Sequence, residues 1–262
     1  MTEENTHFGF TEVPKTEKAE RVAQVFKQVA DQYDIMNDVM SLGTHRLMKR
    51  MAVEATRARP GDTVLDLAGG TGDLSLLLAK RVGSHGTVLL CDINAAMLDV
   101  GRDRLIDQGY SDVRLVQGDA ECLPVADASL NAAIIGFGLR NVTDKDQALR
   151  AIRAALIPGA RLVILEFSKL QIPALVPAYN AFSSIWPKVG QWLTGDSAPY
   201  QYLIESIAMH PDQETLASMM REAGFVGVGY SNLGGGVAAM HYGEAPMPGA
   251  ASTSQSPDTS VG

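Results

Sequence analysis

Cysteine is scarce in this sequence and forms no metal-binding pattern. The 262 residues include two cysteines, Cys91 and Cys122, both in apolar surroundings. A disulfide framework or a structural zinc site needs more cysteines at characteristic spacings. The sequence therefore predicts free thiols in a reducing cytoplasm, and no metal is expected.

Positive charge is also in short supply. Lys and Arg number 22 against 30 Asp and Glu, which gives a net charge of −8. No basic run could follow a phosphate backbone, and this argues against a nucleic-acid partner. The first residues are acidic and precede no apolar core, so no signal peptide is expected. The hydrophobic content of 46% suits one large domain.

A glycine-rich turn follows the first strongly apolar stretch. Residues 64–73 read VLDLAGGTGD, and a helical pattern begins directly after them. Glycines at such a turn allow positive φ and a close approach to a ligand, and the amides of the next helix face that ligand. The pattern indicates a nucleotide-binding α/β domain. A turn without any ligand is the alternative, although so dense a glycine cluster is uncommon in plain turns.

Two cofactor classes compete for this turn. A dinucleotide fingerprint requires G-x-G-x-x-G, but here the third glycine is a serine. A methyltransferase loop has an acid followed by two glycines, which Asp66, Gly70 and Gly72 supply. Asp92 ends the next apolar stretch, where an acid can accept both ribose hydroxyls. Carboxylates at Asp66 and Asp73 would repel a pyrophosphate but suit a sulfonium and an ammonium group. The turn therefore favours S-adenosylmethionine (SAM) over a nicotinamide cofactor.

Strand and helix patterns alternate through the rest of the chain. Strands are predicted at 63–68, 86–92, 112–118, 130–136, 160–167, 225–231 and 236–242, and helices at 19–33, 45–58, 74–82, 95–108, 145–156 and 212–223. The alternation predicts an α/β fold with a mainly parallel sheet and helices on both faces. A short glycine link joins the last two strands, so that pair is expected to be antiparallel.

The domain organisation follows from the same patterns. Residues 1–18 are predicted to form a loose arm, and 19–245 a single domain. Within it, the helices of 19–60 are expected to cap the first strand. Residues 246–262 are rich in Pro, Ser, Thr and Gly, and they are predicted to be a disordered tail.

Four separate segments carry motifs of one enzyme family. They are YDIMNDVMSLGTHR at 33–46, the loop at 65–73, GFGLRNVTD at 136–144 and ESIAMHPDQETL at 205–216. With them the chain resembles the ubiquinone/menaquinone biosynthesis C-methyltransferases, a class I SAM-dependent family. The resemblance covers residues 17–243. The chain departs from it at Met48, where members often have Trp, and at Gly136, where they often have Ser.

The resemblance implies a fold and a reaction. The fold is a Rossmann-like sheet of seven mostly parallel strands in the order 3-2-1-4-5-7-6, with strand 7 antiparallel. The reaction is methyl transfer from SAM to a ring carbon of a polyprenylated quinol, either 2-polyprenyl-6-methoxy-1,4-benzoquinol or demethylmenaquinol. The quinol is the expected acceptor because its ring is electron-rich. Loss of a phenolic proton, whose ordinary pKa is about 10, makes the adjacent carbon nucleophilic.

The resemblance also implies roles for single residues. At the reacting ring, Arg140 stabilises a phenolate or orients a water, Asn141 bonds a quinol oxygen, and Tyr33 walls the ring or bonds its hydroxyl. A salt bridge with a helix cap is the alternative for Arg140 and Asn141, core packing for Tyr33, and an N-cap for Asp119. The residues expected to bind the cofactor are Gly70, Thr71, Gly72, Asp92, Asp119, Ala120 and Gly136.

The acceptor's prenyl tail bears on location. Residues 170–187 are apolar, but their prolines argue against a membrane span. A lid at 170–205 over the tail is expected, with core or a homodimer face as the alternative. We expect a cytoplasmic protein that reaches the inner face of the membrane peripherally or through a biosynthetic complex. Another small-molecule methyltransferase, a nicotinamide oxidoreductase and a non-catalytic SAM-binding module stay open.

Overall fold

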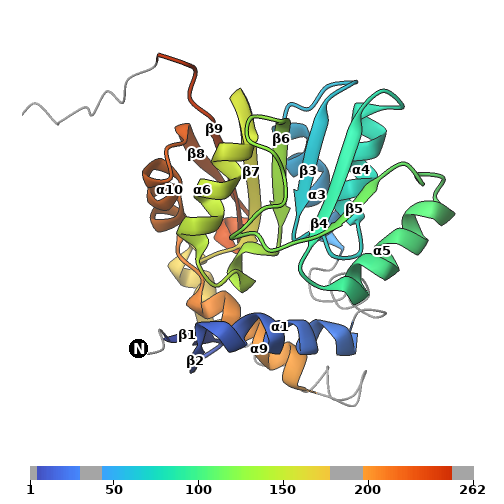
Figure 1. The fold of residues 1–262 in the computed structure, drawn as a ribbon. Helices are drawn as coiled ribbons and strands as arrows, with labels where there is room; N and C mark the ends of the chain where they lie inside the picture. Colours follow the sequence, from blue (N-terminus) through green and yellow to red (C-terminus); the bar gives the residue numbers. More distant parts are fainter. Residues whose placement is uncertain (1–4, 30–42, 178–196, 250–262) are drawn as a thin grey trace, which may run out of the picture.

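A seven-stranded sheet forms the centre of the computed structural model, which describes residues 5–29, 43–177 and 197–249 (Figure 1). Its order is β5-β4-β3-β6-β7-β9-β8, and β9 runs antiparallel to both of its neighbours. This confirms the predicted class I arrangement. The strands are β3 (Thr63–Leu67), β4 (Thr87–Asp92), β5 (Arg114–Gln117), β6 (Leu130–Gly136), β7 (Leu156–Phe167), β8 (Val226–Leu233) and β9 (Ala238–Glu244).

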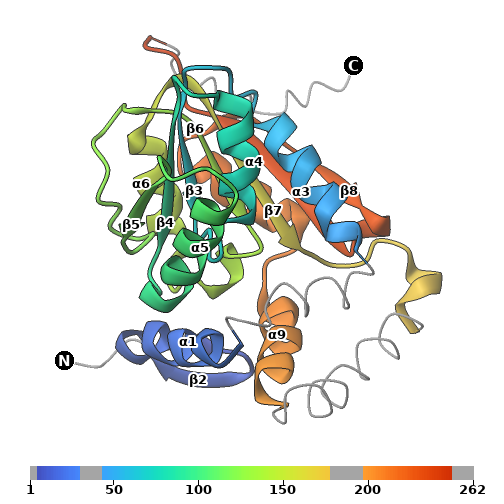
Figure 2. The ribbon, with the colours of Figure 1, turned by 90° about the vertical axis from the view of Figure 1, so that its right-hand side faces the viewer.

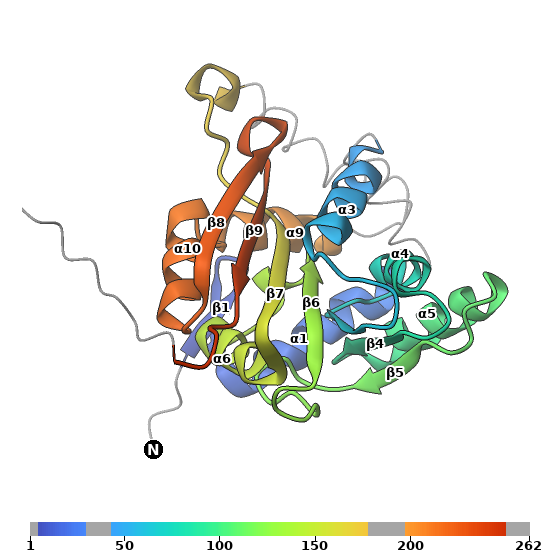
Figure 3. The same ribbon diagram turned by 90° about the horizontal axis from the view of Figure 1, so that it is seen from above.

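Helices cover both faces of the sheet (Figure 3). Successive strand residues alternate between two apolar cores, because side chains of a strand point to opposite faces. The helices are α3 (Thr44–Ala55), α4 (Asp73–Val82), α5 (Ala95–Asp107), α6 (Lys145–Ala155) and α10 (Gln213–Glu222). Val64 and Ile134 belong to the core under α3, α4 and α5, whereas Leu65 and Ile135 belong to the core under α6 and α10.

A further layer lies at one end of the sheet (Figures 1 and 2). It contains α1 (Lys15–Val29), α9 (Ala198–Met209) and a hairpin of β1 (Asn5–Phe8) and β2 (Thr11–Pro14). The Phe8 ring stacks on Tyr202 with 4.5 Å between centroids, and the Phe10 amide donates to Glu205 at 3.1 Å. The prediction of a loose arm at residues 1–18 is therefore wrong for residues 5–18, because contacts with α9 hold them in place.

Several predicted segments lie partly outside the described residues. The cap at 19–60 lacks 30–42, the lid at 170–205 lacks 178–196, and the tail at 246–262 lacks 250–262. The described part of the lid region holds η3 (Pro173–Leu175) and the start of α9. Among the described helices, none has the length and apolar content to cross a bilayer.

Candidate active site

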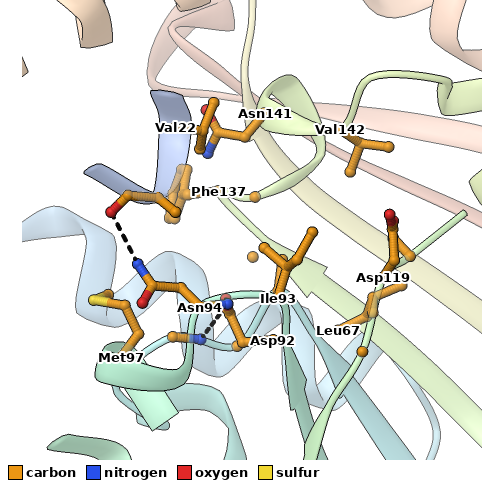
Figure 4. A pocket seen from close by; sticks show the side chains of 18 of the residues that line it. Val22, Leu67, Asp92, Ile93, Asn94, Met97, Asp119, Phe137, Asn141 and Val142 are labelled. Atoms are coloured by element: carbon orange, nitrogen blue, oxygen red, sulfur yellow. Dashed lines mark hydrogen bonds between the residues drawn. The ribbon is translucent and has the colours of Figure 1, made fainter. Parts of the chain in front are cut away.

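A cavity opens at the carboxyl ends of the central strands (Figure 4). The loops after β3, β4, β5 and β6 line it, and α1 contributes Val22 and Ala23. Ligands of open α/β sheets bind at this edge, where the connections leave a crevice. The sequence-predicted residues can therefore be judged by whether they reach this cavity.

The glycine loop after β3 forms the floor of the cavity. A Cβ at Gly69 would lie 2.4 Å from Leu90 Cδ1 and 2.7 Å from Asp66 Cγ, so only glycine fits there. Gly70 has φ 54° and lines the cavity, while Gly72, with φ 79°, is the N-cap residue of α4. Thr71 lines the cavity, but Gly72 does not. Gly72 therefore has a structural role in the turn before α4 and is not part of the cavity lining.

Asp92 lines the cavity in a fixed position. It is 9% exposed at the end of β4, where Oδ2 accepts from the Gly70 amide and Oδ1 from the Asn94 amide, both at 2.9 Å. Burial raises the pKa of Asp92, and the backbone hydrogen bonds oppose this rise. A carboxylate has about four lone-pair sites, so the remaining ones can accept two hydroxyl groups. The fixed position and the spare acceptors fit the ribose of SAM.

The other two acids of the turn are not free carboxylates facing a cation. Asp66 is fully buried, accepts a hydrogen bond from Ser75 Oγ at 2.7 Å, and lies outside the cavity lining. Burial raises the pKa of Asp66 to about 7. Asp73 pairs with Lys49 at 2.6 Å and with Arg104 at 2.5 Å. Burial opposes these cations, but the pKa of Asp73 still falls below its ordinary value. The charge argument from the sequence therefore fails for Asp66, which does not reach the cavity, whereas Asp73 lines the cavity as a carboxylate already paired with two cations.

The remaining cofactor residues surround the same cavity. Asp119 and Ala120 line it after β5, and Asp119 Oδ1 also accepts from the Glu121 amide at 2.9 Å, as in the capping alternative. Gly136 lines it at the end of β6. A Cβ there would lie 2.4 Å from Leu74 Cδ1, so a serine would require Leu74 to move. The glycine at this position matches the local packing.

Arg140 does not line the cavity, so the structure gives no support to its predicted contact with a phenolate. Its side chain is 2% exposed, and Nη1 lies 3.0 Å from Glu166 Oε1. The Arg140 amide also donates to Glu166 Oε2 at 3.2 Å, and the guanidinium donates to the Phe137 carbonyl. The guanidinium lies 5.6 Å from the centre of the Phe167 ring. The structure thus shows the salt-bridge alternative, in which Arg140 supports the loop from behind.

Asn141 reaches the cavity, whereas Tyr33 lies outside the described residues. Asn141 belongs to η2 (Leu139–Asn141), directly after β6. Its Oδ1 accepts a hydrogen bond of 3.0 Å from the Tyr202 hydroxyl of α9. Of the three residues predicted to be catalytic, Asn141 is therefore the one that is both described and part of the cavity lining.

Some cavity residues escaped the sequence prediction. Asn94 Nδ2 donates to the Ala23 carbonyl at 3.3 Å, which fastens α1 over the cavity (Figure 4). Asn94 also caps α5, and that role is readable from an Asn before a helix. Phe137 lines the cavity with φ 58°, an uncommon value for a bulky residue. No local signal announces Val22 or Ala23, because the docking of α1 is a long-range event.

Comparison with known proteins gives the family. The ubiE/COQ5 methyltransferase family matches residues 14–245. The protein named ubiquinone/menaquinone biosynthesis C-methyltransferase UbiE from Legionella pneumophila (strain Corby) is 54% identical over 240 residues, which cover 91% of this chain and 96% of that protein. Its namesake from Cellvibrio japonicus (strain Ueda107) is 55% identical over 243 residues, 92% of this chain and 98% of that protein.

Solved structures agree on the fold. A SAM dependent methyltransferase from Aquifex aeolicus superposes with a TM-score of 0.58 at 15% identity, covering 80% of this chain and 96% of that one. Phosphoethanolamine N-methyltransferase 2 from Haemonchus contortus, in complex with SAM, gives 0.54 at 14% identity, with coverage of 72% and 50%. The sequence matches extend over nearly all of this chain and of its relatives, so the chain belongs to the ubiE/COQ5 methyltransferase family.

Proposed function

We propose that this protein transfers a methyl group from SAM to a ring carbon of a polyprenylated quinol, in ubiquinone or menaquinone biosynthesis. The observation that carries the proposal is the identity of 54% to a curated quinone-pathway C-methyltransferase over 96% of its length. The cavity supports the proposal, because Asp92, an acid suited to a ribose, and the side-chain amide of Asn141 line the same largely apolar space.

We assign different roles to the residues that line the cavity. Asp92, Thr71 and Asp119 would hold the cofactor, whose sulfonium supplies an electrophilic methyl group when it is bound. Asn141 would hydrogen-bond a ring oxygen of the acceptor. Val22 and Ala23 cover the cavity and help to exclude water, which strengthens polar interactions inside it. These residues would hold the two reactants next to each other, and alignment of the reactants supplies much of the rate in a reaction of this kind.

Methyl transfer is expected to depend on the redox state of the acceptor. With methyl-labelled SAM, label should enter demethylmenaquinol under reducing conditions and not the oxidised quinone, because only the quinol ring is electron-rich. The measurement is label in the extracted quinone after reoxidation. Equal labelling of both forms would contradict the proposed ring chemistry. No label in either, with SAM binding intact, would point to another acceptor class.

Because the prenyl tail of the acceptor lies in the membrane, the proposal includes a peripheral contact between the protein and the membrane. Four exposed apolar side chains, Leu47, Met51, Ile172 and Val176, lie on α3 and on residues 170–177. Both segments meet the turn η4 (Gly234–Gly236): a Cβ at Gly234 would lie 3.9 Å from Met48, and one at Gly235 would lie 3.0 Å from Ile172. These side chains offer an exposed apolar surface that would enter the membrane interface, and binding through it would need no electrostatic attraction to anionic lipid.

Replacing both Leu47 and Met51 by glutamine should weaken binding to phosphatidylcholine vesicles by at least about thirtyfold, since burying each large apolar side chain contributes more than about 1 kcal/mol. Vesicle flotation measures the partition. Val226→Ser removes another exposed apolar side chain, on β8, and serves as the control that leaves partition unchanged. Equal losses of vesicle binding in the Leu47 and Met51 double variant and in Val226→Ser would reject a specific membrane-binding face. Unchanged vesicle binding by the double variant would reject it as well.

A further inference from the structure

We propose that Tyr202 is a positioning residue that fixes the side-chain amide of Asn141, so that its nitrogen faces the cavity and donates to a ring oxygen of the acceptor. The inference rests on the proposed quinol acceptor. It assigns to α9 a part in the reaction, although Tyr202 itself does not line the cavity.

The hydrogen bond between these two residues sets the direction of the amide. An asparagine side chain has an acceptor oxygen on one branch and a donor nitrogen on the other. Because Oδ1 accepts from Tyr202 at 3.0 Å, Nδ2 is turned away from α9. Among the described residues, no hydrogen-bond partner of Nδ2 is found, and Asn141 is one of the residues that line the cavity (Figure 4). The donor thus points to the space where a ligand binds.

The Tyr202 hydroxyl is a dependable donor. Its ring is buried and stacks on Phe8 at 4.5 Å, with 22° between the ring planes. Burial raises the pKa of Tyr202 to about 12, and Glu166 adds to the rise while Arg140 opposes it. The phenol therefore keeps its proton at neutral pH and can donate to Asn141. Since the N-terminal hairpin holds the ring, the hydroxyl has one position relative to Asn141.

The direction of the amide matters because the acceptor gains negative charge when a phenolic proton leaves. An amide nitrogen facing that oxygen stabilises the charge, whereas an amide oxygen would repel it. The two branches of the amide have nearly the same shape, so packing alone discriminates poorly between the two orientations. The hydrogen bond from Tyr202 to Oδ1 selects one of the two orientations of the amide. Its loss should lower kcat more than it changes the affinity for SAM.

A double-mutant cycle tests this coupling. Tyr202→Phe keeps the ring and the stacking on Phe8 but removes the hydroxyl. We expect kcat at saturating SAM and demethylmenaquinol to fall about tenfold, with the KM for SAM unchanged. In the Asn141→Ala background the same substitution should have no effect. Equal losses in both backgrounds would assign Tyr202 a merely structural role and overturn the inference.

Tyr200→Phe is the matched control. Tyr200 lies two residues earlier in the same helix and is buried, but its hydroxyl makes no hydrogen bond to Asn141. We expect full kcat from this variant. A loss in Tyr200→Phe as large as in Tyr202→Phe would show that any hydroxyl lost from α9 disturbs the fold, and it would count against the specific coupling.

A spectroscopic measurement separates this inference from the proposed function. In protein labelled with 15N-asparagine, the Asn141 side-chain signals are identified by their loss in Asn141→Ala. They should shift and broaden in Tyr202→Phe and stay unchanged in Tyr200→Phe. Unchanged signals in Tyr202→Phe would overturn the positioning role. If the wild-type protein methylates no quinol, the proposed function fails, while this measurement still decides whether Tyr202 orients Asn141.

Discussion

Asp92→Ala is expected to raise the Kd for SAM by at least about a hundredfold. Hydrogen bonds to a charged group contribute about 1.5–3 kcal/mol each, and two lost ribose contacts amount to about 3–6 kcal/mol. The substitution also removes the acceptor for the Gly70 and Asn94 amides, which shape the floor of the cavity. Titration calorimetry with SAM measures the effect directly, without any acceptor.

Two further variants define what the loss means. Asp92→Asn retains the size and one acceptor oxygen, so its Kd should lie between those of the wild type and the alanine variant. Asp99→Asn alters an exposed acid of α5 that pairs with Arg102, and its Kd should equal that of the wild type. A wild-type Kd in Asp92→Ala would remove Asp92 from the cofactor site and leave the loop without its expected ribose ligand.

Arg140→Ala is expected to destabilise the protein by about 3–5 kcal/mol, because it leaves Glu166 buried without its cation. Arg140 and Glu166 are 2% and 1% exposed at their side chains, so solvent cannot replace the lost partner. Urea denaturation followed by circular dichroism measures the change. Activity should decline in proportion to the folded fraction, since the guanidinium does not line the cavity.

The pair of substitutions Arg140→Met and Glu166→Gln isolates this cause. Removing both charges should recover much of the stability lost in Arg140→Ala, as apolar or neutral groups of similar size often replace a buried ion pair. Arg221→Ala, which breaks the exposed pair with Glu214, should change stability by less than about 1 kcal/mol. A fully stable Arg140→Ala that binds SAM but has lost turnover would restore a direct catalytic role for Arg140.

The part of the fold that the sequence predicts well is the part encoded by local patterns. The apolar run of β3, the glycine loop and the acid that ends β4 are neighbours along the chain, and their spacing alone places Asp92 and Gly70 at one edge. The family resemblance adds the strand order. The local patterns depend on residues close together in the sequence, where chain geometry leaves few alternatives.

Long-range contacts explain what the sequence left undetermined. Asp73 is neutralised by Lys49, 24 residues earlier, and Arg140 is paired with Glu166, 26 residues later. Each of these charges has many potential partners in the composition, so no spacing rule selects the one that folding brings near. The order of the N-terminal hairpin likewise depends on α9, and its own polar sequence gives no sign of it.

The cover of the cavity joins the beginning of the chain to its last third, and this has a consequence for biosynthesis. The Phe10 amide meets Glu205, and the Lys18 ammonium meets the Val142 carbonyl at 3.3 Å. Residues of the hairpin leave the ribosome well before α9, which emerges only after most of the sheet has been made. A nascent chain must therefore keep Phe8 without its Tyr202 partner until α9 has emerged, so the hairpin can take its final place only late in synthesis of this region.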